Sequence, residues 1–132
     1  MYNSTIWDHF RHPRNRTPME NPDAVGESRY HRCGDRLRLM LRLDDGLIAE
    51  ARFEAFGCGP VVAMASVGTE MITGLPVEEA LTLSAFTLND ALGGLPVSKR
   101  HAILMFLEAL HQALQPPNQP GSGEKKCQND MQ

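Results

Sequence analysis

The sequence predicts an α+β domain in which a small antiparallel sheet comes first and helices then pack on one of its faces. Two patterns carry this prediction. Apolar residues alternate with polar ones between residues 36 and 56, and from residue 61 onward they recur at helical spacing. The chain has 132 residues, of which 42% are hydrophobic, so it is long enough for one domain with its own core.

The first predicted element is a short helix within NSTIWDHFRHP, residues 3–13. Asn3 or Ser4 is the expected N-cap, and Pro13 ends the segment. The later stretch NPDAVGES, residues 21–28, is rich in residues that favour turns. The sequence therefore indicates a loop or an irregular edge between the first helix and the sheet.

Two strands joined by a tight turn follow. In RLRLMLRL, residues 36–43, leucines alternate with arginines and one methionine, which is typical of a half-buried strand. The sequence DDG at residues 44–46 supplies the turn, and residues 47–56 alternate again. One face of the second strand is expected to carry Leu47, Ala49, Ala51, Phe53 and Ala55, and the other face Ile48, Glu50, Arg52 and Glu54.

Helical segments make up the rest of the predicted domain. The first, residues 61–74, ends at Gly74, and the second, residues 75–83, has Pro76 in its first turn. A short helix over residues 86–96 closes on a double glycine. The last helix, residues 97–115, has Ser98 as its expected cap and an apolar stripe made of Ile103, Phe106, Leu107, Leu110 and Leu114.

Composition limits the classes of function. Residues 1–115 are predicted to form the domain, and residues 116–132, rich in proline, glycine and polar residues, a flexible tail. The net charge of −3 argues against a nucleic-acid partner, although the early arginines could meet an acidic protein. Neither a signal peptide nor a membrane span is visible. Three widely spaced cysteines do not suit a disulfide framework and favour the reducing cytoplasm.

The candidate site lies where the two predicted strands begin and end. Cys33 precedes the first strand and Cys58 follows the second, and an antiparallel hairpin brings these two ends together. Asp35 is expected on the same side as Cys33. Gly57 and Gly59 leave the Cys58 thiol unobstructed, and the helix that starts at Pro60 favours its thiolate, which is the form that binds metal.

Two thiolates, one carboxylate and one imidazole would make a tetrahedral metal site if His101, in the first turn of the last helix, joins them. The residues alone leave alternatives open. Asp35 could instead cap a turn, and His101 could be a surface residue. Cys127, in the tail, is interpreted as an uncommitted thiol. No H-E-x-x-H or related zinc-enzyme motif occurs, so an enzyme is the least favoured class.

Four stretches together resemble a known family: DHFRHPRN, CGD, ARFEAFGCG and the segment from Leu95 to His101. They are similar, in order and spacing, to the IscU/NifU-type iron–sulfur scaffold family, from about Tyr2 to Leu114. The resemblance implies a three-stranded antiparallel sheet and a non-enzymatic scaffold that carries a transient 2Fe–2S cluster and also accepts iron or zinc. The site residues that it implies are Cys33, Asp35, Cys58 and His101.

The resemblance also implies partners, namely a cysteine desulfurase, apo iron–sulfur clients, and a DnaK-like chaperone with its J-type co-chaperone. Leu95, Pro96 and Lys99 fall in the chaperone-recognition stretch, which is LPVSK here and usually L-P-P-V-K. Ala102 replaces the third cysteine, which receives persulfide sulfur in the family. The prediction is therefore a divergent scaffold or carrier. The alternative is an interaction or regulatory protein that binds zinc and assembly partners without building clusters.

Overall fold

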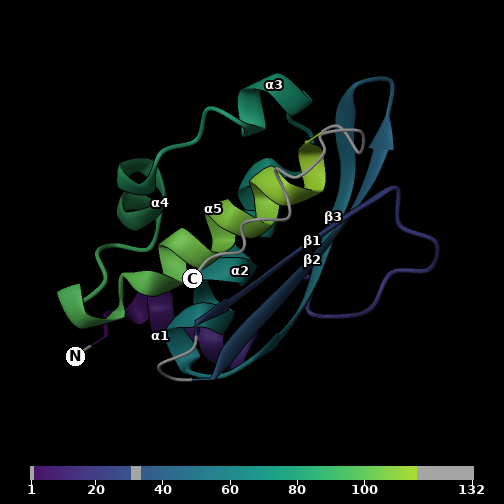
Figure 1. Cartoon of the computed structure of the whole chain (residues 1–132). Coiled ribbons are helices and arrows are strands. Elements are labelled where there is room, and N and C mark those ends of the chain that lie inside the picture. The colour runs from purple at the N-terminus through teal and green to yellow at the C-terminus, as the bar shows by residue number, and fades with distance from the viewer. Residues whose placement is uncertain (1, 31–33, 116–132) are drawn as a thin grey trace.

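The computed structural model describes residues 2–30 and 34–115, and it shows one antiparallel sheet with helices against one face (Figure 1). The strands lie in the order β1-β2-β3. They are β1 Ala24–Tyr30, β2 Asp35–Asp44 and β3 Leu47–Phe56. The helices are α1 Ser4–Arg11, α2 Gly59–Ile72, α3 Val77–Ala80, α4 Ala85–Ala91, the 3₁₀ helix η1 Val97–Lys99, and α5 His101–Leu114. The predicted α+β class is confirmed.

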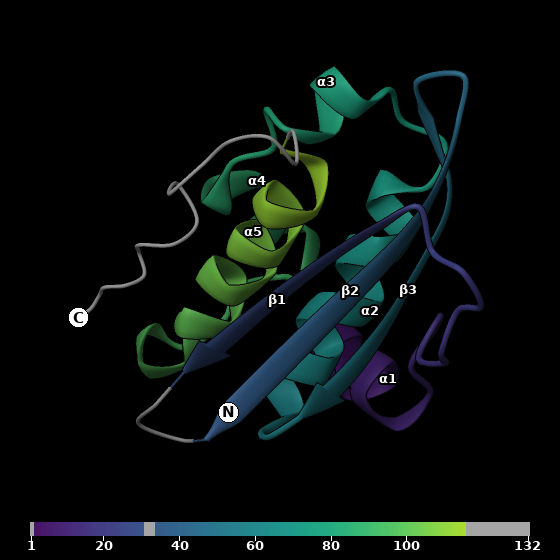
Figure 2. The same cartoon turned by 45° about the vertical axis from the view of Figure 1, so that its right-hand side comes forward.

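The core lies between the sheet and helices α2 and α5. Helix α5 packs on β1 and β2, helix α2 packs on β3, and no helix of the described segments covers the other face of the sheet (Figure 2). The alternation predicted for the first strand is confirmed from Arg36 to Leu39, where leucines are buried and arginines exposed, but Met40, on the arginine side, is buried as well. None of the helices in the described segments is long and apolar enough to cross a membrane.

The hairpin forms where predicted. The faces predicted for the first residues of its second strand are wrong. Asp45 and Gly46 take φ values of 55° and 80°, as a tight hairpin turn requires. Pairing then passes from Arg42 with Glu50 to Leu43 with Ile48, so Ala49 is an extra residue that forms a β-bulge. The bulge turns Ile48 into the core and leaves Leu47 and Ala49 exposed. From Ala51 to Ala55 the predicted inner face is confirmed.

Strand β1 lies where turn-forming residues indicated a loop. It pairs with β2 from Ala24 opposite Leu41 to Tyr30 opposite Asp35. Its Gly26 faces helix α5 so closely that an added Cβ would lie 1.8 Å from the backbone oxygen of Ala109. This glycine therefore marks a close approach of strand and helix rather than a turn. The three strands agree with the number that the family resemblance implied.

Several helix ends follow their predicted signals, but Pro76 is the N-cap residue of α3 and not part of its first turn. Asn3 caps α1, because its side chain accepts a hydrogen bond from the backbone N–H of Ile6. The helix α2 ends at Ile72, shortly before Gly74, which has a positive φ of 92°. Ser98 is not the cap of the last helix. It lies within η1, and α5 begins at His101 without a side-chain cap.

A buried histidine attaches the first helix to the second. His9 is buried, with its Nδ1 2.7 Å from the Ser66 Oγ of α2. The same Ser66 hydroxyl accepts a hydrogen bond from the backbone N–H of Arg14. Helix α1 is thereby held against the N-terminal half of α2, which starts beside Cys58.

Candidate metal centre

Three of the four predicted ligands meet at one end of the sheet. Asp35 opens β2, Cys58 is the N-cap residue of α2, and His101 opens α5. The His101 Nε2 lies 2.9 Å from Asp35 Oδ2, and the Cys58 Sγ lies 3.3 Å from the same oxygen. The Sγ and Nε2 atoms are 4.0 Å apart. Cys33 and Cys127 lie outside the described residues.

This arrangement has the compactness that a small metal ion needs. The three ligand atoms lie within 4.8 Å of one another. Around a tetrahedral zinc, with bonds of about 2.0–2.3 Å, ligand atoms stand roughly 3.2–3.8 Å apart. The observed separations bracket that range, and only the hydrogen-bonded Asp35 and His101 atoms would have to move apart. One carboxylate, one thiol and one imidazole can therefore bind a single ion together.

Asp35 is held by the loop that carries Cys58. Its side chain is 1% exposed, and its Oδ1 accepts a hydrogen bond from the Cys58 backbone N–H at 3.1 Å. Gly57 makes this approach possible, because a Cβ there would lie 2.1 Å from Oδ1 and its φ of 134° is one that other residues avoid. Asp35 thus fixes the loop with one oxygen and faces the centre with the other.

The Cys58 thiol is protonated in the metal-free centre. Burial raises its pKa, and the hydrogen bond and charge of Asp35 raise it further, while the backbone N–H of Val61 and the charge of Lys99 act in the opposite direction. The helix N-terminus favours the thiolate through the Val61 N–H, as expected, but burial and Asp35 outweigh this effect, so the thiol is not primed to ionise in this state. A bound cation would take the place of the thiol proton, since sulfur binds metals as the thiolate.

Sequence reasoning missed one residue of the centre. Tyr30, the last residue of β1, stacks on the His101 imidazole with ring centroids 4.0 Å apart and planes 12° apart. Tyr30 reaches this position because it pairs directly with Asp35 across the strands. This pairing cannot be predicted as long as residues 21–28 are interpreted as a loop. Tyr30 could have been placed opposite Asp35 only if β1 had been predicted as a strand. The stack fixes the plane of the imidazole.

The position next to His101 belongs to the core. Ala102 is 0% exposed and packs within the main hydrophobic cluster. Its methyl group can neither ligate a metal nor accept sulfur. The described part of the centre therefore offers one sulfur atom, that of Cys58.

An aromatic wall borders the same thiol. Tyr2, Trp7 and Phe10 form a chain of edge-to-face ring contacts at the N-terminus. Together with Ile6, Gly59 and Pro60 they line a pocket of about 140 Å³ that Cys58 also lines. Cys58 thus lies between the polar centre on one side and an apolar surface on the other.

The stretch from Leu95 to Lys99 is folded against the domain. Leu95 is buried and its backbone N–H donates to the Asn89 side chain, while Val97 is exposed at the start of η1. Pro96 and Lys99 are half-buried. A partner that reads this stretch as an extended peptide would have to unfold it locally.

The sequence of the chain is similar to those of known proteins. The family described as the NifU-like N terminal domain matches residues 1–119. An iron-sulfur cluster assembly scaffold protein of Archaeoglobus fulgidus, IscU 1, is 37% identical over 114 residues, which cover 86% of this chain and 74% of that protein. The IscU scaffold protein of Aquifex aeolicus is also 37% identical, over 115 residues that cover 86% of this chain and 73% of its own.

Solved structures show the same fold. A putative iron-sulfur cluster assembly scaffold protein for the SUF system from Fervidobacterium islandicum superimposes with a TM-score of 0.72 at 22% identity, covering 86% of this chain and 96% of that one. A NifU-like protein (N-terminal) from Brucella abortus superimposes with a TM-score of 0.58 at 21% identity, covering 83% and 76%.

Proposed function

The chain belongs to the family of NifU-like N-terminal domains, and from this premise we propose that it is an iron–sulfur cluster assembly scaffold rather than an enzyme. The observation that carries the proposal is the convergence of Asp35, Cys58 and His101 on one point. The scaffold names of the relatives that are 37% identical support the same reading. The cargo would be a transient 2Fe–2S cluster, or its iron alone.

The donor set suits such a cargo. A thiolate is a soft ligand that iron–sulfur clusters require, and an imidazole can replace a thiolate on cluster iron. A carboxylate is a harder ligand and would make the cluster easier to release. We assign the fourth position to Cys33, because it stands two residues before Asp35 in the sequence. The same four groups would also accept zinc.

Assembly partners follow from the proposed role. A cysteine desulfurase would supply sulfur, and apo iron–sulfur proteins would receive the cluster. A DnaK-like chaperone with a J-type partner would bind Leu95, Pro96 and Lys99, for which the exposed Val97 offers a starting point. We place the protein in the cytoplasm, with residues 1–115 as the scaffold domain and 116–132 as its tail.

One experiment tests the proposal directly. The full chain is purified without oxygen, and iron, zinc and acid-labile sulfide are measured per chain. We expect iron with a comparable amount of sulfide, and loss of both in Cys58→Ser. Cys127→Ser is the matched control, since it removes a thiol outside the proposed site. Metal and sulfide that remain in Cys58→Ser would remove the centre from the proposal.

Ala102 favours a second candidate function. Without a thiol at this buried position, the protein would bind zinc and assembly partners and regulate assembly without building clusters. Zinc without sulfide in the purified chain would support this candidate. Ala102→Cys then separates loss of one thiol from wider divergence. A gain of sulfide in the presence of a desulfurase and cysteine would mean that the thiol alone was missing.

A further inference from the structure

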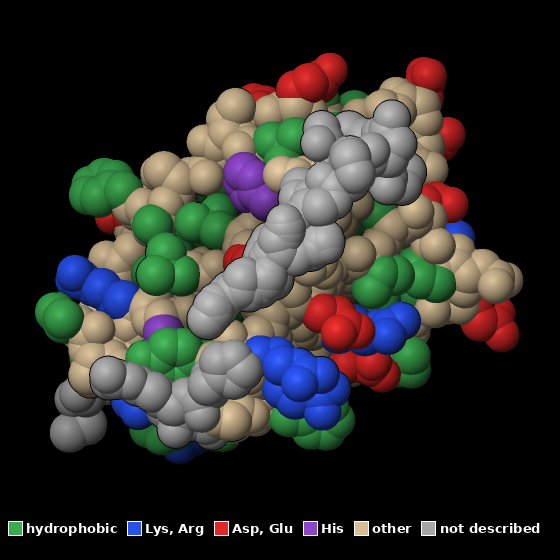
Figure 3. Space-filling view, in the orientation of Figure 1, with side chains coloured by type: hydrophobic (Ala, Val, Ile, Leu, Met, Phe, Trp, Pro, Cys, Tyr) green, Lys and Arg blue, Asp and Glu red, His purple; other side chains and the backbone are tan. Residues whose placement is uncertain are grey.

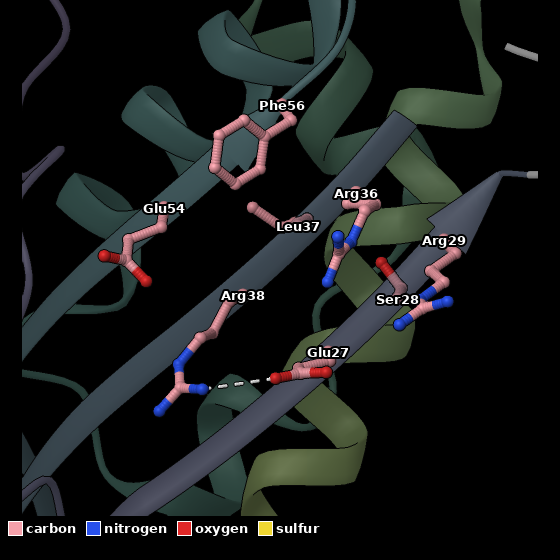
Figure 4. A pocket seen from close by; sticks show the side chains of 8 residues that line it. All are labelled: Glu27, Ser28, Arg29, Arg36, Leu37, Arg38, Glu54 and Phe56. Carbon is pink, nitrogen blue, oxygen red and sulfur yellow. Dashed lines mark hydrogen bonds and ion pairs between the residues drawn. The ribbon is translucent and has the colours of Figure 1, made fainter. Parts of the chain in front are cut away.

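The helix-free face of the sheet carries a pocket that the proposed function does not use. Its volume is about 180 Å³. All three strands contribute to it, and Figure 4 shows the residues that line it: Glu27, Ser28, Arg29, Arg36, Leu37, Arg38, Glu54 and Phe56. On this side of the molecule, basic and acidic side chains lie together beside hydrophobic surface (Figure 3).

Two arginines face each other across the strands in this pocket. Arg29 of β1 pairs directly with Arg36 of β2, and both are exposed. Like charges directly opposite each other destabilise a sheet. The nearest acid along β1, Glu27, is engaged by Arg38 at 3.3 Å. Across residues 2–30 and 34–115, no carboxylate forms an ion pair with Arg29 or Arg36. A bound anion would therefore reduce the repulsion between the two guanidinium groups.

The pocket also has an apolar wall. Phe56, which pairs with Arg36 from the other side, is 67% exposed. Figure 4 places the Phe56 ring over β3, with Arg36 and Arg29 following it across the sheet. A small inorganic anion would use the guanidinium groups and leave this ring in water. A carboxylate with an apolar group beside it would contact both the guanidinium groups and the Phe56 ring.

We propose that Arg29 and Arg36 bind a carboxylate from an acidic segment of a partner protein, with an adjacent apolar side chain of that segment packed on Phe56. The planar guanidinium group suits carboxylates because it can donate two parallel hydrogen bonds. Arg29 precedes Tyr30 and Arg36 follows Asp35 in the sequence, so the segment would dock at the same end of the sheet as the metal centre but on its other face. The proposal stands whether or not that centre holds a cluster.

The test is a titration of the full-length ¹⁵N-labelled chain, followed by NMR. The probe is the acetylated peptide amide Glu-Glu-Phe-Glu-Glu, and the comparison peptide is its glutamine counterpart. We expect shifts at the arginine Nε–Hε groups and around Phe56, which weaken as salt screens the charges. The double variant Arg29→Ala/Arg36→Ala should bind the acidic peptide at least about tenfold more weakly.

Arg52→Ala is the matched control, because it removes the same charge from the same face. Its guanidinium group pairs with Glu50 and binds the Pro18 carbonyl, away from the pocket. We expect it to bind the probe like the unchanged chain. Equal affinity of the double variant and the unchanged chain would overturn the proposal. Inorganic phosphate that competes as well as the peptide, with no effect of Phe56→Ala on peptide binding, would assign the pocket to small anions instead.

Discussion

The carboxylate of Asp35 acts on the thiol of Cys58. Asp35 Oδ2 accepts the thiol hydrogen bond, and together with burial this raises the pKa of Cys58. Asp35→Asn removes the charge and keeps the side-chain shape, so we expect a lower Cys58 pKa. Iodoacetamide should then alkylate Cys58 of the metal-free variant with a pH profile displaced to lower pH. Peptide mapping by mass spectrometry distinguishes Cys58 from Cys33 and Cys127. An unchanged profile would mean that burial alone sets the pKa.

Tyr30 is the second residue whose role can be isolated. Its ring lies parallel to the His101 imidazole. Groups that orient a metal ligand commonly change metal affinity by about 10–100-fold. We expect Tyr30→Ala to weaken cobalt binding about tenfold, measured by competition with a chelator. The imidazole should also become less well oriented, which alters the visible spectrum of the bound cobalt.

The conservative variant decides whether the stacked ring or the hydroxyl group of Tyr30 is responsible. Tyr30→Phe keeps the stacked ring and removes the hydroxyl group. We expect it to bind cobalt like the unchanged chain, with the same spectrum. If Tyr30→Phe loses affinity as Tyr30→Ala does, the hydroxyl group rather than the stack is responsible.

At the scale of elements, local signals were sufficient for the hairpin and insufficient for β1. The turn at Asp45 and Gly46 and the alternation in β2 depend on neighbours in sequence. Gly26 depends on Ala109 of α5, which comes more than 80 residues later. The same division applies to the site. Asp35 and Cys58 could be brought together from the hairpin alone, whereas His101 and Tyr30 reach them only through tertiary packing.

Gly26→Ala tests the close approach of β1 and α5. The added Cβ would overlap the Ala109 backbone, so strand and helix would have to move apart. We expect a loss of about 3 kcal/mol in the free energy of unfolding, measured with urea. Gly46→Ala is the control, because nothing lies within 4 Å of its Cβ and only its positive φ opposes the change. That backbone term costs about 1–2 kcal/mol. A smaller loss in Gly26→Ala than in Gly46→Ala would contradict the packing argument.

Over the whole molecule, separate parts of the chain are held at the same end of the sheet. Helix α1 brings Trp7 and Phe10 beside Cys58, and α5 brings His101. The arginine pocket lies on the opposite face of the sheet and is lined by Arg36, the residue that follows Asp35. The centre therefore borders two surfaces of different character, one aromatic and one charged. The junction of α1 with α2 decides whether the aromatic surface stays in place.

That junction makes the stability of the fold depend on pH. Burial lowers the pKa of His9, and the charge of Arg14 lowers it further, against smaller opposing effects of Glu70 and Asp8. The folded state therefore keeps His9 neutral, while the unfolded chain takes up a proton near the ordinary histidine pKa of about 6.5. Below that value the unfolded state binds more protons, so stability is present above it and is lost as the pH falls toward the folded pKa.

We expect the thermal unfolding midpoint to fall between neutral and mildly acidic pH, and to fall less in His9→Gln. Glutamine can still hydrogen-bond to Ser66 but does not titrate. The variant is less stable than the unchanged chain at neutral pH, and the difference shrinks on acidification. His12→Gln is the control for loss of an exposed histidine on the same segment. Profiles that stay parallel for the unchanged chain and His9→Gln would show that another group causes the acid sensitivity, and α1 would then hold the aromatic wall beside Cys58 independently of pH.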